Sequence, residues 1–245
     1  MSNSGTTTLT GNVVLSNTAQ AGTLALANSG NVLISGVISD GTAAGGSLAK
    51  SGSGVLALSG VNTFTGGTTV TGGLIQFASL SNFGTGNLTL NGGGVQWAPE
   101  TNVDVTPRLN ALGAGGGAFH TNGNNVTLAG AISGTGALTK AGAGILALTG
   151  TNTYAGGTHV TGGLVEFTSL ANLGSGDLTL DGGGLRWASG SVADLSSRNL
   201  TLGTAGGSID SNGNHVTLTN LSGAGGITKI GTGTLTLTDT NGNYG

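Results

Sequence analysis

Apolar and polar residues alternate in short runs along the whole chain, and Gly, Asn, Asp and Ser bound these runs. Alternation of this kind between turn-forming residues is typical of half-buried β-strands. Glycine also recurs every few residues, and each glycine inside a helix costs about 1 kcal/mol relative to alanine. The pattern therefore predicts an all-β chain in which helix is nearly excluded.

The runs form two interleaved series of inward-facing candidates that share a mean step of about 22 residues, a period typical of solenoids. The first series comprises Val32/Ile34, Leu56/Leu58, Ile75/Phe77, Val95/Trp97, Val126/Leu128, Leu146/Leu148, Val165/Phe167, Leu185/Trp187, Val216/Leu218 and Leu235/Leu237. The second comprises Leu138, Val160, Leu178/Leu180, Leu200/Leu202 and Ile227. Two series with one step predict two sheets that each gain a strand per coil, which is the arrangement of a parallel β-helix.

A longer period of ninety residues lies over the coils, because Gly60–Phe77 is repeated as Gly150–Phe167 and a third start appears at Thr240–Gly245. We expect four coils per repeat, with room in the longer fourth coil for a third strand near Phe119 and Ile209. About eleven coils, at about 4.8 Å each, would make a rod roughly 50 Å long. The expected divisions of this single β-helix are N-terminal coils (1–49), repeat 1 (50–139), repeat 2 (140–228) and a truncated repeat 3 (229–245).

The repeated motif is interpreted as architectural. Its glycine clusters suit tight corners that need positive φ, its Asn-Thr pair suits side-chain-to-backbone turns, and its aromatic residue can cover the corner. We expect Phe77/Trp97 and Phe167/Trp187 to stack inside the coil. The motif residues with expected structural roles are Gly60, Asn62, Thr63, Phe64, Gly66, Gly67, Gly72, Gly73, Phe77 and Trp97, with Gly150, Asn152, Thr153, Tyr154, Gly156, Gly157, Gly162, Gly163, Phe167 and Trp187 in the second copy.

One pair of outward positions tests the register. Gln76 and Gln96 lie one expected coil apart in the first copy, and their equivalents are Glu166 and Arg186. The pattern predicts a Gln–Gln stack in one repeat and a Glu–Arg ion pair in the next. An exposed pair of this kind contributes about 0–1 kcal/mol.

Composition narrows the class of protein. The chain of 245 residues holds 52 glycines, two prolines and no cysteine, with 36% apolar residues, 6% charged residues and a net charge of -3. This apolar fraction with low charge argues against disorder, and the absence of cysteine excludes disulfides and thiolate metal sites. No run approaches a membrane helix, and the polar start is no signal peptide. Because a third motif copy is cut short at Tyr244-Gly245, we expect a piece of a longer protein. Six scattered Lys and Arg residues form no patch for nucleic acid.

Candidate chemistry is sparse. Glycoside hydrolysis needs two carboxylates roughly 5–9.5 Å apart, whereas the closest local pair, Asp177 and Asp181, would lie about 13 Å apart along one strand. Their counterparts are Asn87 and Asn91, so we expect turn roles. Of the three histidines (His120, His159 and His215), His159 aligns with Thr69 and His215 with Asn125, so neither of these two is a repeat feature, and we expect surface positions. We therefore expect no catalytic residue, no metal site and no cofactor.

The motif, together with the segment after it, resembles the passenger-associated transport repeat of bacterial autotransporters. The residues that carry the resemblance are Gly-x-Leu-x-Leu-x-Gly-x-Asn-Thr-Tyr/Phe-x-Gly-Gly-Thr-x-Val-x-Gly-Gly-Leu, then Leu-Gly-x-Gly-x-Leu-Thr-Leu-x-Gly-Gly-Gly-Leu. They fix about twenty positions and cover Gly54–Trp97 and Gly144–Trp187, with a partial copy at Gly233–Gly245.

The resemblance implies a right-handed parallel β-helix in the secreted, surface-exposed passenger of a Gram-negative bacterium. It implies a parent chain with a C-terminal barrel, and repeats that assist export and folding. The expected function is a stalk or adhesin scaffold without enzymatic activity. A host surface or self-association at unpaired terminal edges would supply the partners.

Two alternatives stay open from the sequence. A carbohydrate-binding or carbohydrate-active β-helix would gather carboxylates or aromatics on one outer face. An ice-binding solenoid would need flat outward threonine arrays, for which the candidates are Thr69/Thr71, Thr89 and Thr236/Thr238.

Overall fold

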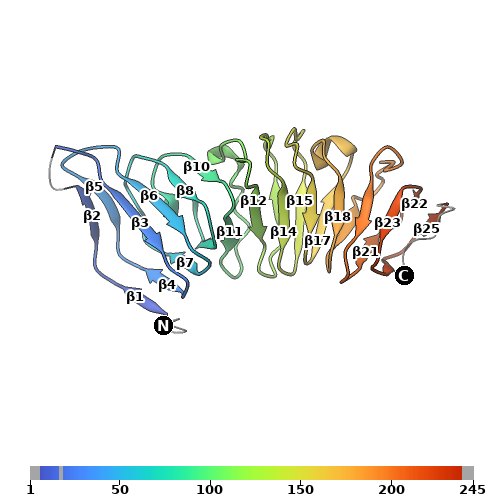
Figure 1. Ribbon diagram of the computed structural model, residues 1–245, viewed down its shortest axis with the longest axis horizontal. Helices are drawn as coiled ribbons and strands as arrows, with labels where there is room; N and C mark the ends of the chain where they lie inside the picture. The colour runs from blue at the N-terminus through green and yellow to red at the C-terminus, as the bar shows by residue number, and fades with distance from the viewer. Residues whose placement is uncertain (1–5, 17–18, 239–245) are drawn as a thin grey trace.

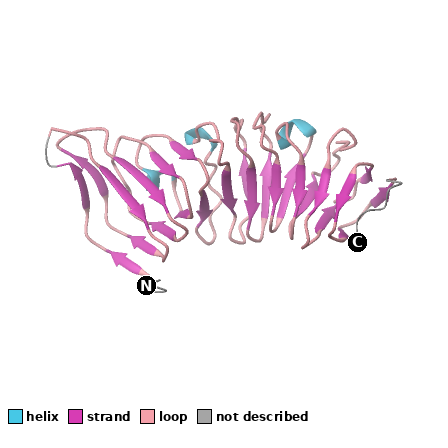
Figure 2. Cartoon of the chain, viewed as in Figure 1, coloured by secondary structure: helices cyan, strands magenta, loops and turns pink. Residues whose placement is uncertain are grey.

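The computed structural model describes residues 6–16 and 19–238, which form one stack of coils (Figure 1). Strands and loops make up almost all of the described chain, and its helical elements are three short 3-10 turns (Figure 2). Every strand pair is parallel, as expected when each coil lies on the previous one. The all-β parallel solenoid is thus confirmed. The third motif start at Thr240–Gly245 lies outside the described residues.

One sheet runs the length of the stack and counts the coils. Its eleven strands are, in spatial order, β1 (Thr7–Leu9), β4 (Val32–Ile34), β7 (Val55–Leu58), β9 (Leu74–Phe77), β11 (Gly94–Trp97), β12 (Gly117–His120), β14 (Leu138–Ala141), β16 (Thr158–Val160), β18 (Leu178–Leu180), β20 (Leu200–Leu202) and β23 (Leu221–Gly223). Ten register steps lead from Thr7 to Gly223, which gives a mean of about 22 residues per coil, as the sequence period predicts. The expected coil length and number are confirmed.

The remaining strands form four shorter sheets. They are a four-stranded sheet of β3 (Thr23–Ala27), β6 (Ser47–Ser51), β8 (Thr68–Val70) and β10 (Leu88–Leu90), and a six-stranded sheet of β13 (Val126–Leu128), β15 (Ile145–Leu148), β17 (Leu164–Phe167), β19 (Gly184–Trp187), β21 (Gly207–Asp210) and β24 (Ile227–Ile230). Two pairs complete them, β2 (Val13–Ser16) with β5 (Ile38–Gly41), and β22 (His215–Leu218) with β25 (Thr234–Leu237). The 3-10 turns are η1 (Leu80–Phe83), η2 (Thr106–Arg108) and η3 (Leu170–Leu173).

The coil has three sides, and the expectation of two sheets is wrong. We call the eleven-stranded sheet side 1. Side 2 begins with β2 and β5, continues through the segment at Thr63, which donates its amide to Ile38, and becomes the six-stranded sheet. Side 3 begins with the four-stranded sheet, continues through the bridges of Leu88 with Leu109 and Leu112 with Gly134, and ends as β22 and β25. Over part of the stack, sides 2 and 3 consist of irregular chain without alternating apolar residues. The sequence pattern therefore did not show that each coil has three sides.

Successive repeats are rotated by one side. Strands β6, β8 and β10 of repeat 1 lie on side 3, whereas their ninety-residue equivalents β14, β16 and β18 lie on side 1, and the next equivalent, β24, lies on side 2. Strands β7, β9 and β11 likewise move from side 1 to side 2 as β15, β17 and β19. The repeat is therefore four coils plus one side, which corrects the expected four. The extra strand expected near Phe119 and Ile209 exists, as β12 and β21, and it belongs to the following coil.

A single apolar core fills the stack from Val32 to Leu221. The inward positions alternate with partly exposed ones, as in β7, where Leu56 and Leu58 are buried. The expected aromatic stacks are confirmed, with ring centroids 5.3 Å apart in Phe77/Trp97 and 4.8 Å apart in Phe167/Trp187. Because the core crosses residues 49, 139 and 228 without a break, the divisions at those positions remain predictions.

Candidate functional site

The asparagine of the repeated motif is a buried bridge between coils. In the second copy the Asn152 side-chain oxygen accepts the Ile132 amide at 2.7 Å, and its side-chain nitrogen donates to the Asn172 carbonyl. Asn62 makes the same two bonds, accepting from Ile38 and donating to the carbonyl of Asn82. Both side chains are almost completely buried. The expected side-chain-to-backbone bonds are therefore present, and they join coils as well as turning the chain.

A second buried asparagine, which sequence reasoning missed, completes each bridge. Asn172 accepts the amides of Thr168 and Ser169 and donates to the carbonyl of Gly150 at 3.0 Å. The equivalent Asn82 repeats this pattern beside η1 and donates to Gly60. The available signal was the Ser-x-x-Asn capping box at the start of each 3-10 turn, at the same ninety-residue offset.

The aromatic residue of the motif lies inside the corner and is completely buried. The Tyr154 hydroxyl contacts the Thr158 hydroxyl at 2.7 Å, and burial raises the pKa of the Tyr154 phenol. Phe64 occupies the same place in the first copy without a hydroxyl. The packing of the ring is therefore the shared feature, and the hydroxyl is an addition of the second copy.

The second glycine pair of the motif encloses a buried lysine. The Lys140 ammonium donates to the carbonyls of Ala141, Gly142 and Gly162 at 3.0, 2.6 and 2.9 Å, and Gly163 lies against it with φ +63°. A Cβ on Gly163 would lie 2.6 Å from the ammonium. Burial lowers the pKa of Lys140 to about 8.

This use of basic residues was also missed. Lys50 donates to the carbonyls of Ser51, Gly52 and Gly72 beside Gly73, which has φ +59°. Arg108 and Arg198, ninety residues apart, cap corner carbonyls in the same manner. The sequence did contain a signal for these buried cations. Lys50, Lys140 and Lys229 stand at equivalent positions of successive repeats, although the basic residues look scattered along the chain. The partners of these buried cations are therefore groups of backbone carbonyl oxygens and not carboxylates.

The other motif residues shape the corners. Thr63 and Thr153 are exposed and pair through their backbones with the coil below. A Cβ on Gly60, Gly66, Gly150 or Gly156 would lie 2.3–2.5 Å from backbone of that coil, and Gly157 has φ +90° while its counterpart Gly67 does not have positive φ. The carbonyls of Gly72 and Gly162 accept hydrogen bonds from the ammonium groups of Lys50 and Lys140.

The predicted outward ladder is present. Gln76 is the register partner of Gln96, and Glu166 is the partner of Arg186, whose Nε lies 3.0 Å from the Glu166 carboxylate. Asp210, which the sequence reasoning did not include, extends the ladder by one coil at 3.6 Å from the same nitrogen. Because the second copy is displaced by one side relative to the first, the Gln76–Gln96 pair lies on side 1 and the Glu166–Arg186 pair lies on side 2.

Two aspartates of the second copy, Asp177 and Asp181, are held by hydrogen bonds between coils. Asp181 accepts the Ala205 amide at 2.8 Å, as Asn91 accepts the Gly115 amide in the first copy. Asp177 accepts from the side chain of Asn199. Among the described residues no group of three His, Asp or Glu side chains is placed to hold a metal ion. Glu166 and Asp210 do approach each other, because both lie against the Arg186 Nε, at 3.0 and 3.6 Å, and Arg186 pairs with both on the outer ladder.

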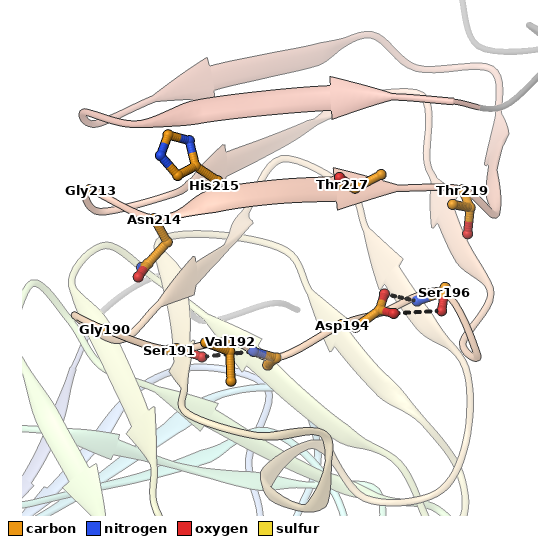
Figure 3. Close-up of a pocket in the computed structure, with 11 residues that line it drawn as sticks. Gly190, Ser191, Val192, Asp194, Ser196, Gly213, Asn214, His215, Thr217 and Thr219 are labelled. Carbon is orange, nitrogen blue, oxygen red and sulfur yellow. Dashed lines mark hydrogen bonds between the residues drawn. The ribbon is translucent and has the colours of Figure 1, made fainter.

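A groove lies near the C-terminal end of the described chain (Figure 3). It has a volume of about 560 Å³ and separates the loop Gly190–Ser196 from β22. The side chains that face it include Asp194, Ser196, His215 and Thr217. Sequence reasoning did not identify this groove, because its walls are a loop and a strand on different coils.

Comparison with known proteins identifies the repeats. Residues 48–77, 138–166 and 227–244 match the family described as passenger-associated transport repeat. The chain is also 36% identical over 135 residues to the adhesin BmaC autotransporter of Brucella suis biovar 1 (strain 1330), a match covering 54% of this chain and 4% of that protein. No solved structure matches the chain.

The chain spans only a small part of that relative, so the activities and partners of the longer protein are not transferred from it. The described residues include no helix of the length and apolarity that a membrane span requires. The matched segments contain the buried asparagine, lysine and aromatic positions of both copies. Three segments of the chain are thus passenger-associated transport repeats, as the sequence resemblance predicted, and the chain is similar to an autotransporter adhesin.

Proposed function

We propose that this segment is a cell-surface stalk with adhesive outer faces, exported as part of an autotransporter passenger. The proposal rests on one observation: the two copies share their buried side-chain interactions but differ in their outward-facing residues. The interior keeps its chemistry, with the same asparagine bridges and lysine caps. The exterior changes, as in Gln76 against Glu166 and Thr69 against His159. Such a scaffold holds its shape while its surface varies.

The repeat geometry supports a stalk. Each coil contacts mainly its neighbours, so coils can be added without altering the rest of the fold. The eleven strands of side 1, at about 4.8 Å each, make a rod roughly 50 Å long. Rotation by one side per repeat presents the outer ladders of successive copies in different directions. A rod of this kind can display contacts around its whole circumference.

The absence of catalysis is part of the proposal. The aspartates engaged in hydrogen bonds between coils support a structural role, as does the similarity to a protein named as an adhesin. Secretion to the surface of a Gram-negative cell, and a parent chain with a C-terminal barrel, belong to the same proposal.

The proposal is tested by display. The chain is fused to an autotransporter barrel in a laboratory Gram-negative strain, and a matched strain carries the barrel alone. We expect protease-accessible chain at the surface and increased attachment to cultured epithelial cells or extracellular matrix. Electron microscopy should show rods longer by roughly 50 Å, the length of the stacked coils. Surface display without increased attachment to either would contradict the adhesive part, and failure to reach the surface would contradict the passenger part.

A further inference from the structure

The two repeats build the junction between their fourth coil and the next one differently. In the first copy, the Asp104 carboxylate accepts the amide and hydroxyl of Thr106 at Oδ1, at 2.8 and 2.7 Å. Its second oxygen accepts the Ala129 amide from the following coil at 3.0 Å. The Thr106 hydroxyl also accepts the Gly130 amide at 2.9 Å. The loop is thus closed against the next coil.

In the second copy the same loop stays open. Asp194, the equivalent of Asp104, accepts the Ser196 amide at 2.8 Å and the Ser196 hydroxyl at 2.9 Å (Figure 3). Within the described residues, no hydrogen bond joins this carboxylate to Thr219, the equivalent of Ala129. A carboxylate has about four acceptor positions, so Asp194 can accept a further donor, as Asp104 does.

One of the substitutions between the copies lies at the closest contact of this junction. A Cβ on Gly130 would lie 2.5 Å from the Thr106 hydroxyl oxygen and 2.8 Å from the Thr106 Cβ, so close contact with the loop requires glycine there. The equivalent residue in the second copy is Asn220. Its side-chain amide donates to the Ser196 carbonyl and acts as a spacer between the loop and the strand.

The groove opened by this spacer offers hydrogen-bond acceptors. Among the described residues that line it, Asp194 is the one carboxylate, and the hydroxyls of Ser196, Thr217 and Thr219 stand near it with the His215 ring. The same lining includes no Lys or Arg side chain and no aromatic ring other than His215. A positive N–H donor complements this lining, because charge-assisted bonds to a carboxylate are about twice as strong as neutral ones. A neutral sugar would lack the stacking ring on which such ligands are commonly held.

We propose that the groove between Gly190–Ser196 and β22 binds a lysine or arginine side chain of a partner polypeptide, whose N–H donor gives the Asp194 carboxylate a third hydrogen bond, as the Ala129 amide gives one to Asp104. The site belongs to the second copy alone, since the first copy closes the same space with its own loop. It stands on the geometry of the junction and does not depend on the adhesive role.

The test uses the whole chain, labelled with nitrogen-15, and a blocked tripeptide with a central lysine. Titration at pH 7.5 and low salt keeps the lysine of the peptide charged. We expect shift changes at Asp194, Ser196 and Thr217, with a dissociation constant on the order of millimolar. Asp194→Asn, an exposed change, and Asn220→Gly, which lets the loop close, should each weaken binding about tenfold or more. Asp104→Asn is the matched control and should leave the affinity unchanged.

The outcomes separate the proposal from its alternatives. Equal binding of the acetyl-lysine tripeptide would overturn it, because the positive charge would then be irrelevant. Groove shifts with a neutral trisaccharide and none with the lysine peptide would show a sugar site instead. Unchanged binding by the Asn220→Gly variant, or no groove shift with up to about 20 mM peptide, a concentration above the expected constant, would also overturn it.

Discussion

The buried asparagine bridge gives the sharpest test of how the motif holds the coils together. Asn152→Ala removes the acceptor of the Ile132 amide and the donor to the Asn172 carbonyl. Both partners are buried, with Ile132 only 1% exposed and Asn172 6% exposed. A buried polar group left without a partner costs about 1–3 kcal/mol, so the variant should lose about 2–5 kcal/mol of unfolding free energy.

The measurement is urea unfolding followed by circular dichroism, with hydrogen exchange at the Ile132 amide as a local readout. Exchange is included because solenoids do not always unfold in a single step. Asn199→Ala is the matched control, since Asn199 is exposed and its side chain bonds only to the Asp177 side chain in the described structure. We expect the control to change stability by less than about 0.5 kcal/mol.

A conservative variant refines the test. Asn152→Asp keeps an acceptor for the Ile132 amide but places a carboxylate oxygen against the Asn172 carbonyl. It should therefore be as harmful as the alanine variant, or more so, because the charge is buried without a counter-ion. If Asn152→Ala costs less than about 1 kcal/mol, or if the Ile132 amide exchanges no faster, the bridge does not stabilise the coils as argued.

Three further predictions concern the corner and the outer ladder. Gly163→Ala should cost at least about 1–2 kcal/mol in urea unfolding, because φ is +63° and the new Cβ would meet the Lys140 ammonium; a neutral result would contradict this. Stability should rise from pH 8 towards 10, because the pKa of Lys140 is lowered from 10.5 to about 8 by burial and the unfolded chain holds the proton longer. It should fall above pH 10, where unfolded Tyr154 ionises before the buried phenol whose pKa is raised. Lys140→Met should reduce the rise, and the remainder comes from Lys50, whose pKa burial also lowers. In pH-dependent melting, a profile that only rises would contradict the sign for Tyr154, and one that only falls would contradict the sign for Lys140. Arg186→Gln should lower the unfolding free energy by about 0–1 kcal/mol, because the ion pair with Glu166 is partly exposed. The difference from the parent chain should vanish near 1 M salt, where the charges are screened, and a loss that does not depend on salt would point to packing instead.

The hydrophobic pattern of the sequence was sufficient for the fold class, the coil length and the local register. Alternation places every second residue inward, so the positions of Leu56, Phe77 and Trp97 follow from the chain itself. The one-coil offset between Glu166 and Arg186 fixed their pairing for the same reason, because neighbouring coils in parallel register align residues one coil apart.

Features that join one coil to another needed the tertiary structure. The third side carries irregular chain with no alternation, so the rotation of each repeat by one side could not be read from apolar spacing. Lys140 resembles an isolated surface charge in the sequence, and only the fold brings three carbonyls together at its ammonium. The groove at Asp194 likewise depends on whether residue 130 or its equivalent, Asn220, carries a side chain facing a loop on another coil. Local periodicity determines which way a side chain points, whereas the packing of coils decides what it meets.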